Sequence, residues 1–229
     1  MDAEQRAPAE TARRRKTRER LLEAAFEVFA EHGLHAVSVE KIAEHAGFTR
    51  GAFYSNFESK EELFFALAER ESSRGLERMR EGFDLLFTER PITPGDLTLD
   101  TLTDIVSLFL QHHRDDRQWL LLQAEFRLLA MRNPVVAQRY HRYNEDIRAQ
   151  FAEVLTTALA GVGMRFTHDP LIITRLLDDA YEAAVQEWAL LPAEERAPNA
   201  LQQALLTVPL LVHAFTEPIP ETAGPTAGS

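Results

Sequence analysis

The sequence contains no cysteine, which excludes a disulfide-stapled fold, a thiolate metal site and a cysteine nucleophile. It also lacks any apolar run approaching the roughly 18 residues that a transmembrane helix requires. The N-terminal segment carries charges without the apolar stretch of a secretory signal. These absences predict a soluble, cytoplasmic protein whose core is large enough to need no covalent support.

Lysine is scarce, and positive charge is unevenly placed along a chain of 229 residues with a formal net charge of −11. Residues 1–70 carry 11 basic and 13 acidic residues (−2), whereas residues 71–229 carry 14 and 23 (−9). The segment Arg13–Arg20 holds six basic residues and one acidic residue. Such a cluster indicates a local site for a polyanion, although a solvated helix start explains it equally well.

Helical periodicity with Gly and Pro between segments, and no strand-like alternation, predicts an all-α fold of about nine helices. Start signals are Ser59 with Glu62 as a capping box, and Asn133 and Asp169, each followed by proline. We expect helices near 13–32, 39–46, 50–55, 59–87, 97–113, 116–132, 134–160, 170–191 and 199–215. The tails 1–12 and 217–229 have the composition of disordered segments.

Residues 38–55 have the pattern of a helix-turn-helix, two short helices that cross steeply around a tight turn. Gly47 supplies the positive φ of the turn, and Phe48 fills the space between the helices. Thr49 caps the second helix, whose Phe53 returns to the same core. The alternative is a tight helix pair that binds no ligand.

The second of these helices suits DNA recognition because only its first turns need to enter the major groove. Arg50 is the candidate for bidentate contact with guanine, with a phosphate contact as the equal alternative. Gly51 costs about 1 kcal/mol of helix stability relative to alanine, which indicates a close backbone approach to a partner.

The segment Gly33–Phe64 closely resembles the DNA-binding domain of the TetR family of bacterial transcriptional repressors. The resemblance is carried by Gly33, Ser38, Val39, Ile42, Ala43, Ala46, Gly47, Thr49, Gly51, Tyr54, Phe57, Lys60 and Leu63. With the first helix it covers residues 13–64, and beyond that it extends only to helix number and length. It implies an all-helical homodimer whose larger domain holds a small-molecule ligand. Asn56 is a departure, since the family commonly has histidine or tyrosine there.

A set of side chains follows from the motif and the resemblance as candidate DNA contacts. Tyr54 and Lys60 are expected at phosphates, and Ser38 and Thr49 at helix N-termini that offer amides to phosphate. Phe53 is expected to pack inward more readily than to touch a thymine methyl. The basic residues from Arg13 to Lys16 form a candidate arm. The full set is Arg14, Ser38, Thr49, Arg50, Gly51, Phe53, Tyr54, Asn56 and Lys60.

The predicted domains are a helix-turn-helix domain at 13–58 and a ligand-binding and dimerisation domain at 59–216. Helices near 170–191 and 199–215 are wide-faced and apolar, which predicts either a four-helix dimer interface or intrachain core. The apolar face of the first carries Leu176, Leu177, Ala180, Ala184 and Val185. Polar and aromatic residues suited to a largely apolar effector are Phe109, His113, Trp119, Gln123, Phe126, Tyr143, Asn144, Tyr181 and Trp188.

These observations predict a ligand-responsive transcriptional regulator, a repressor that a small molecule releases from a palindromic operator. One alternative is a DNA-binding protein whose larger domain binds a protein partner or no ligand. Another is an all-α enzyme that uses Asp178 and Asp179. No catalytic constellation is visible, so we expect no enzymatic activity, no metal and no cofactor. The effector, the operator and the choice between repression and activation are not specified by the sequence.

Overall fold

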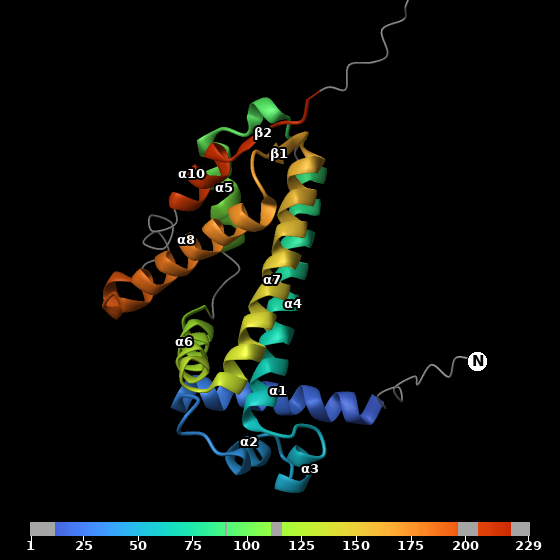
Figure 1. The fold of residues 1–229 in the computed structure, drawn as a ribbon, viewed down its shortest axis with the longest axis vertical. Helices are drawn as coiled ribbons and strands as arrows, with labels where there is room; N and C mark the ends of the chain where they lie inside the picture. The colour runs from blue at the N-terminus through green and yellow to red at the C-terminus, as the bar shows by residue number, and fades with distance from the viewer. Residues whose placement is uncertain (1–11, 90, 111–115, 197–205, 221–229) are drawn as a thin grey trace, which may run out of the picture. The chain divides into compact units, whose positions relative to one another are not determined.

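The computed structural model describes residues 12–89, 91–110, 116–196 and 206–220, and these ranges contain nine α-helices (Figure 1). The helices are α1 Ala12–His32, α2 Val39–His45, α3 Arg50–Tyr54, α4 Lys60–Glu89, α5 Leu99–Leu110, α6 Asp116–Arg132, α7 Pro134–Gly161, α8 Pro170–Leu190 and α10 Thr207–Ala214. Single 3₁₀ turns at Pro94–Asp96 and Ala193–Glu195 lie between helices. The predicted all-α fold is confirmed. No helix within these ranges is both long and apolar enough to span a membrane.

Side-chain caps start the helices where the sequence predicts them. Asp169 Oδ1 accepts a hydrogen bond from Leu171 N at 2.9 Å before α8, and Asn133 Oδ1 accepts one from Val135 N at 3.1 Å before α7. Before α4, Ser59 Oγ accepts a hydrogen bond from Glu62 N at 3.0 Å. Each cap satisfies an amide that has no partner inside its own helix. The predicted starts of these three helices are confirmed.

The described residues form two compact units. The first contains the residues up to Ser72 together with Leu121–Tyr140, and the second contains Ser73–Leu120 together with the residues from His141 onward. Helices α4, α6 and α7 therefore each contribute residues to both units. This division differs from the boundary after residue 58 drawn from the sequence, because the start of α4 and most of α6 pack with the N-terminal helices. The functional division stays a prediction.

An aromatic cluster forms the centre of the first unit. The ring of Phe126 stacks on Phe64 with centroids 3.8 Å apart and an interplanar angle of 12°. Phe65 meets the same ring edge-on at 4.8 Å and 86°. Because Phe126 is 0% exposed and both partners are buried, residues of α6 are part of the core of the first unit.

The second unit has two apolar clusters. One comprises Ile92, Leu97, Leu102, Leu159, Val162 and Met164. The other comprises Leu120, Ala184 and Val185, with partly buried side chains of α5, α8 and α10 packed against it. Buried Leu177 on α8 adds to the intrachain packing. Much of the apolar face that the sequence offered for dimerisation is therefore intrachain core.

A small antiparallel sheet was not predicted from the sequence. Strand β1 (Met164–Phe166) pairs with β2 (Thr216–Pro218), and Arg165 binds Glu217 Oε1 through Nε at 3.0 Å and Nη2 at 2.7 Å. Strands of three residues are too short to show alternation in a sequence. The expectation that a disordered tail begins at residue 217 is therefore wrong for residues 217–220. Residues 1–11, 197–205 and 221–229, including the start of the predicted last helix, lie outside the described ranges.

Candidate nucleic-acid interface

The turn between α2 and α3 has the geometry expected of a helix-turn-helix. Gly47 has φ +72°, in the left-handed region that favours glycine, and Phe48 N donates to Ala43 O at 2.8 Å. Arg20 on α1 donates from Nη2 to Ala46 O at 2.7 Å, and its guanidinium lies 4.6 Å from the Phe48 ring centroid. Arg20 of α1 therefore stabilises the turn through these two contacts.

Both short helices begin with the predicted caps. Ser38 Oγ accepts a hydrogen bond from Lys41 N at 3.2 Å, and Thr49 Oγ1 accepts one from Ala52 N at 3.2 Å. Both cap residues are exposed. Each hydroxyl is thus hydrogen-bonded to the helix that it starts. The rest of each residue stays exposed to solvent.

The inner face of α3 is core. Phe53 is 0% exposed and packs against Phe57 with ring centroids 5.8 Å apart. Arg18 lies over the Phe57 ring at 4.3 Å and donates to Asn56 O at 2.6 Å. The inclusion of Phe53 among the DNA contacts is therefore wrong, because its buried ring presents no surface to a ligand.

The outer face of α3 is open. Arg50 and Tyr54 are exposed one helical turn apart, and the guanidinium carbon of Arg50 lies 5.4 Å from the Tyr54 ring centroid. A Cβ added to Gly51 would meet only Thr49 Oγ1, at the ordinary contact distance of 3.8 Å. The chain itself therefore gives no packing reason for glycine at this position.

Asn56 is a buried structural residue. Its Nδ2 donates to Ala52 O at 2.8 Å and to Ser55 Oγ at 3.2 Å, and the side chain is 8% exposed. Because both amide hydrogens are committed within the chain, a hydrogen bond from Asn56 to a phosphate is contradicted. The asparagine instead ends α3 by bonding back to it.

Lys60 also has an internal role that the sequence did not reveal. Its Nζ donates to Leu34 O at 2.7 Å and to Val37 O at 3.0 Å, both in the loop between α1 and α2. These bonds direct the ammonium toward the loop carbonyls. Lys60 therefore positions the loop before α2, and its contact with a phosphate stays a prediction.

Glu125 of α6 holds the same loop from another element. One carboxylate oxygen accepts a hydrogen bond from Leu34 N. The other would lie 2.9 Å from a Cβ at Gly33, whose φ is +78°. Glycine at position 33 therefore both ends α1 and leaves room for the carboxylate. Sequence reasoning predicted the helix end but had no signal for a partner 91 residues away.

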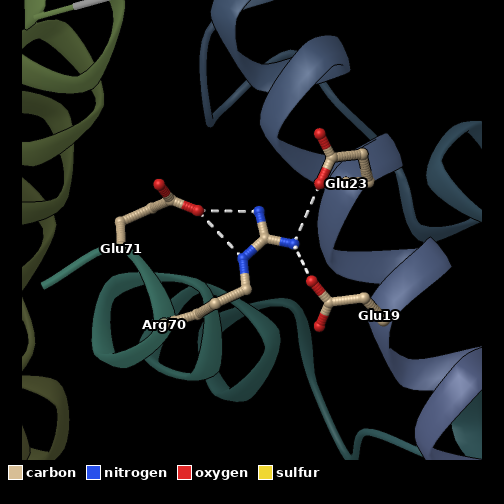
Figure 2. Close-up of polar contacts among 4 residues, drawn as sticks. All are labelled: Glu19, Glu23, Arg70 and Glu71. Atoms are coloured by element: carbon tan, nitrogen blue, oxygen red, sulfur yellow. Dashed lines mark hydrogen bonds and ion pairs between the residues drawn. The ribbon is translucent and has the colours of Figure 1, made fainter. Parts of the chain in front are cut away.

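A charged cluster joins α1 to α4 (Figure 2). Arg70 Nη1 lies 3.0 Å from Glu19 and 3.0 Å from Glu23, and its Nη2 lies 2.8 Å from Glu71. The Arg70 side chain is only 10% exposed, whereas Glu19 and Glu23 remain largely exposed. The guanidinium therefore connects the two helices while it offsets part of the local negative charge.

The basic N-terminal segment is helical. Residues from Arg13 to Lys16, including Arg14, are exposed in the first turns of α1. The candidate arm is therefore part of a helix, because α1 begins at Ala12. Their charges are presented on a helix surface.

The predicted effector-binding residues do not form one group. Phe126 is wrong as a pocket residue because it lies in the aromatic core of the first unit. Gln123 also belongs to the first unit. In the second unit, the partly buried Tyr181 and Trp188 pack against the Leu120 cluster, and Trp188 Nε1 is buried without a hydrogen-bond partner. The remaining members of the second unit, all partly buried, are Trp119, Tyr143 and Asn144. The side chain of Phe109 and the whole of His113 lie outside the described part.

The two aspartates of the enzyme alternative have separate partners. Asp178 Oδ2 lies 3.5 Å from Arg148 Nε, and Asp179 Oδ2 lies 3.9 Å from Arg175 Nε. Burial raises the pKa of Asp178 against the lowering effect of Arg148. No group of three or more potential metal ligands occurs among the described residues. This arrangement is that of individual ion pairs and does not favour catalysis by the two carboxylates.

Comparison with known proteins connects this geometry to a family. The family model described as bacterial regulatory proteins, tetR family, matches residues 21–67. The chain is 31% identical over 157 residues to the HTH-type transcriptional repressor AcnR of Corynebacterium diphtheriae, covering 61% of this chain and 81% of that protein. It is 40% identical over 65 residues to the HTH-type transcriptional regulator UidR of Escherichia coli (strain K12), covering 28% and 33% respectively.

Solved structures share the fold. A transcriptional regulator from Rhodococcus sp. Rha1 matches with a TM-score of 0.62 at 24% identity, covering 86% of this chain and 97% of that one. A TetR transcription regulator from Haloarcula marismortui matches with a TM-score of 0.59 at 18% identity, covering 89% and 100%. At these identities the likeness concerns the fold alone.

Proposed function

Because the chain belongs to the TetR family of bacterial regulatory proteins, it is a DNA-binding transcriptional regulator, and we propose that α3 reads its operator. The proposed reading face consists of Thr49, Arg50, Gly51 and Tyr54. The observation that carries the proposal is the separation of faces on α3: Arg50 is 64% exposed and Tyr54 47% exposed, whereas Phe53 is fully buried. A helix buried on one side and open at its first turns suits insertion into a major groove.

Each residue of the reading face has a distinct task in this proposal. Arg50 donates to guanine O6 and N7, the acceptors that its planar guanidinium matches. The Tyr54 hydroxyl donates to a phosphate, and the absence of a side chain at Gly51 allows the backbone to approach the duplex. Phosphate contacts set the register of the helix, whereas the choice of sequence rests on the base contact.

The exposed basic turns of α1, including Arg14, supply a second phosphate-binding element. An acidic chain can bind DNA through such a local cluster, because salt limits electrostatic reach to about 8–10 Å at ordinary ionic strength. The excess of acid falls in residues 71–229, while residues 1–70 are near neutrality. Ser38, exposed at the start of α2, completes the proposed set of DNA contacts.

The first test is binding of the full chain to duplex DNA from upstream of its own coding region. We expect the log–log salt slope to be about −0.9 per phosphate neutralised. Arg50→Ala should weaken binding to the duplex that wild type recognises by about 10- to 100-fold, since a bidentate guanine contact contributes about 1–3 kcal/mol of discrimination. Fluorescence anisotropy measures both quantities, and a random duplex library extends the search for an operator. Salt-independent binding, or wild-type affinity after Arg50→Ala, would contradict the proposal.

Gly51→Ala separates DNA binding from folding. The added methyl group has open space around it, and alanine favours helix by about 1 kcal/mol over glycine, so the variant should be as stable as wild type or more so. Operator affinity should nevertheless fall, because the methyl group would stand between the backbone and the duplex. Thermal unfolding and anisotropy on the same samples measure the two effects. Unchanged affinity would show that no close approach occurs at Gly51.

Regulators of this family bind their operators as dimers, and we place the dimer interface of this chain on α8 and α10. Several large apolar side chains remain exposed there: Leu171, Ile172, Leu176 and Leu190 on α8 and Leu210 on α10. Exposed apolar surface of this kind is what a protein–protein interface would bury. Two-fold symmetry would present two reading faces to a palindrome with half-sites about 34–36 Å apart, or a multiple of that distance.

We further propose that the protein is a repressor released by a small molecule bound in the second unit. The buried, unpartnered Trp188 Nε1 beside Tyr181 and the Leu120 cluster offers the mixture of apolar wall and single polar donor that effector sites use. The effector can shift the DNA-binding equilibrium only by its differential affinity for the two states. The reading function lies in the proposed domain 13–58, and effector binding and dimerisation lie in residues 59–216.

A metabolite panel added to the preformed protein–DNA complex tests the release mechanism. We expect at least one largely apolar compound to lower DNA affinity and to quench tryptophan fluorescence in wild type but less in Trp188→Phe. If DNA binding persists with every compound, the alternative of a second unit that binds a protein partner or nothing is favoured.

A further inference from the structure

The proposed base-reading group of this protein is already paired with a carboxylate. Arg50 Nη1 lies 2.7 Å from Glu40 Oε1, with the two side chains 64% and 52% exposed. Glu40 lies in the first turn of α2, so the pair joins the exposed surfaces of both helices of the motif. A partner duplex would therefore meet Arg50 together with a negative charge.

The Glu40 carboxylate is half exposed, and its neighbours favour its charged form. The hydrogen bond from its own backbone N–H keeps the pKa of Glu40 below its ordinary value, with Arg50 and the Ser38 hydroxyl acting in the same direction. Ser38 Oγ in turn accepts from Lys41 N, so it is fixed as the cap of α2. The carboxylate is thus ionised near neutral pH and tied to the start of α2.

This pairing affects specific and non-specific DNA in different ways. On a duplex without a suitably placed guanine, Arg50 has only phosphates to bind, and repulsion between a phosphate and the Glu40 carboxylate on the same guanidinium opposes that contact. On a duplex with guanine in place, the guanidinium has five N–H donors and can bind O6 and N7 while it keeps Nη1 on Glu40. The carboxylate can also accept from a neighbouring cytosine N4.

We infer that Glu40 is a specificity-determining residue that positions Arg50 for guanine and weakens its use on phosphates. The inference rests on the proposed reading face. Glu40 does not raise total affinity for DNA. It raises the ratio of operator affinity to non-specific affinity, because it makes the phosphate-only complex less favourable than the complex with guanine.

Glu40→Gln tests this role against Glu44→Gln as a matched control. Glu44 is also an exposed glutamate of α2, and its substitution removes the same charge without touching the Arg50 pair. An operator is first selected from a random duplex library with the wild-type full chain. Affinity is then measured for that operator and for a scrambled duplex of equal length and composition, across a series of salt concentrations.

For Glu40→Gln we expect the operator-to-scrambled affinity ratio to fall by about five-fold, as expected for the loss of an exposed ion pair. The log–log salt slope on scrambled DNA should steepen by about 0.9, because Arg50 gains a phosphate. Glu44→Gln should change the affinity for both duplexes by the same factor and leave the salt slope near that of wild type. Thermal unfolding of both variants should match wild type, which excludes a folding defect as the cause.

An Arg50→Met background tests whether Glu40 acts through Arg50. There, Glu40→Gln should lower the affinity ratio no more than Glu44→Gln does. A persistent five-fold effect without Arg50, or identical ratios for the two glutamine variants in the wild-type background, would overturn the role of Glu40. If the wild-type chain selects no sequence, the proposed reading function itself fails, so the two failures are distinct.

Discussion

Phe126→Ala is expected to lower the free energy of unfolding by about 3–5 kcal/mol, the range for truncating a buried phenylalanine. The ring is fully buried, stacked on Phe64 and met edge-on by Phe65, so its loss leaves a cavity between α4 and α6 within the first unit. Chemical denaturation monitored by circular dichroism measures the effect. Since domains of this kind have only about 5–15 kcal/mol in total, the loss would be a large fraction of it.

Phe126→Leu is the matched variant, because it keeps much of the apolar volume and should lose clearly less stability than alanine. The pair also decides between the two roles considered for this residue. A ring that lined an effector pocket would, when truncated, change the effector response with little loss of stability. A stability change below about 1 kcal/mol for Phe126→Ala would contradict its assignment to the core.

Leu176→Arg is expected to convert the protein to a monomer and to weaken operator binding by about 100-fold or more. The leucine is 41% exposed on α8, and an arginine at its place would put a charge into the proposed interface. A single reading head then loses the benefit of its partner, which for linked binding sites is about 10²–10⁴ in affinity. Sedimentation velocity gives the oligomeric state, and anisotropy on a full palindrome gives the affinity.

Leu85→Arg provides the control for this substitution. Leu85 is an exposed leucine of α4 in the same unit but outside the proposed interface. It should leave both the dimer and the affinity for a palindrome near wild type. On a single half-site, Leu176→Arg should bind as wild type does, since the reading face is untouched. A dimeric Leu176→Arg would exclude this part of α8 from the interface.

Features specified by neighbouring residues were predictable from the sequence. Ser38, Thr49 and Asp169 cap the helices that follow them because a short polar side chain reaches an amide two or three residues away. Gly47 has the positive φ that its position between two helices requires. These local effects also place Phe53 inside and Arg50 outside on α3.

Features that depend on distant partners were not predictable. The sequence gives no sign that two carbonyls of the loop before α2 accept hydrogen bonds from Lys60. The residues around Phe126 in the sequence give no sign of its partners. The aromatic rings from α4 that pack against it are identified only by the fold. The sheet pairs segments that are too short to carry a periodic pattern.

The contact between Glu125 and the loop that follows α1 sets a rule for building hybrid regulators. A chimera that transplants only the first 58 residues onto another member of the family would separate Leu34 from its carboxylate. A graft of the first 72 residues would also separate Phe64 from Phe126. The graft should therefore carry residues 121–140 as well, because they belong to the same compact unit. The unit that has to be transferred as a whole is encoded by two separate stretches of the gene. Recombination at a single crossover point would break contacts within this unit and so destabilise the hybrid protein.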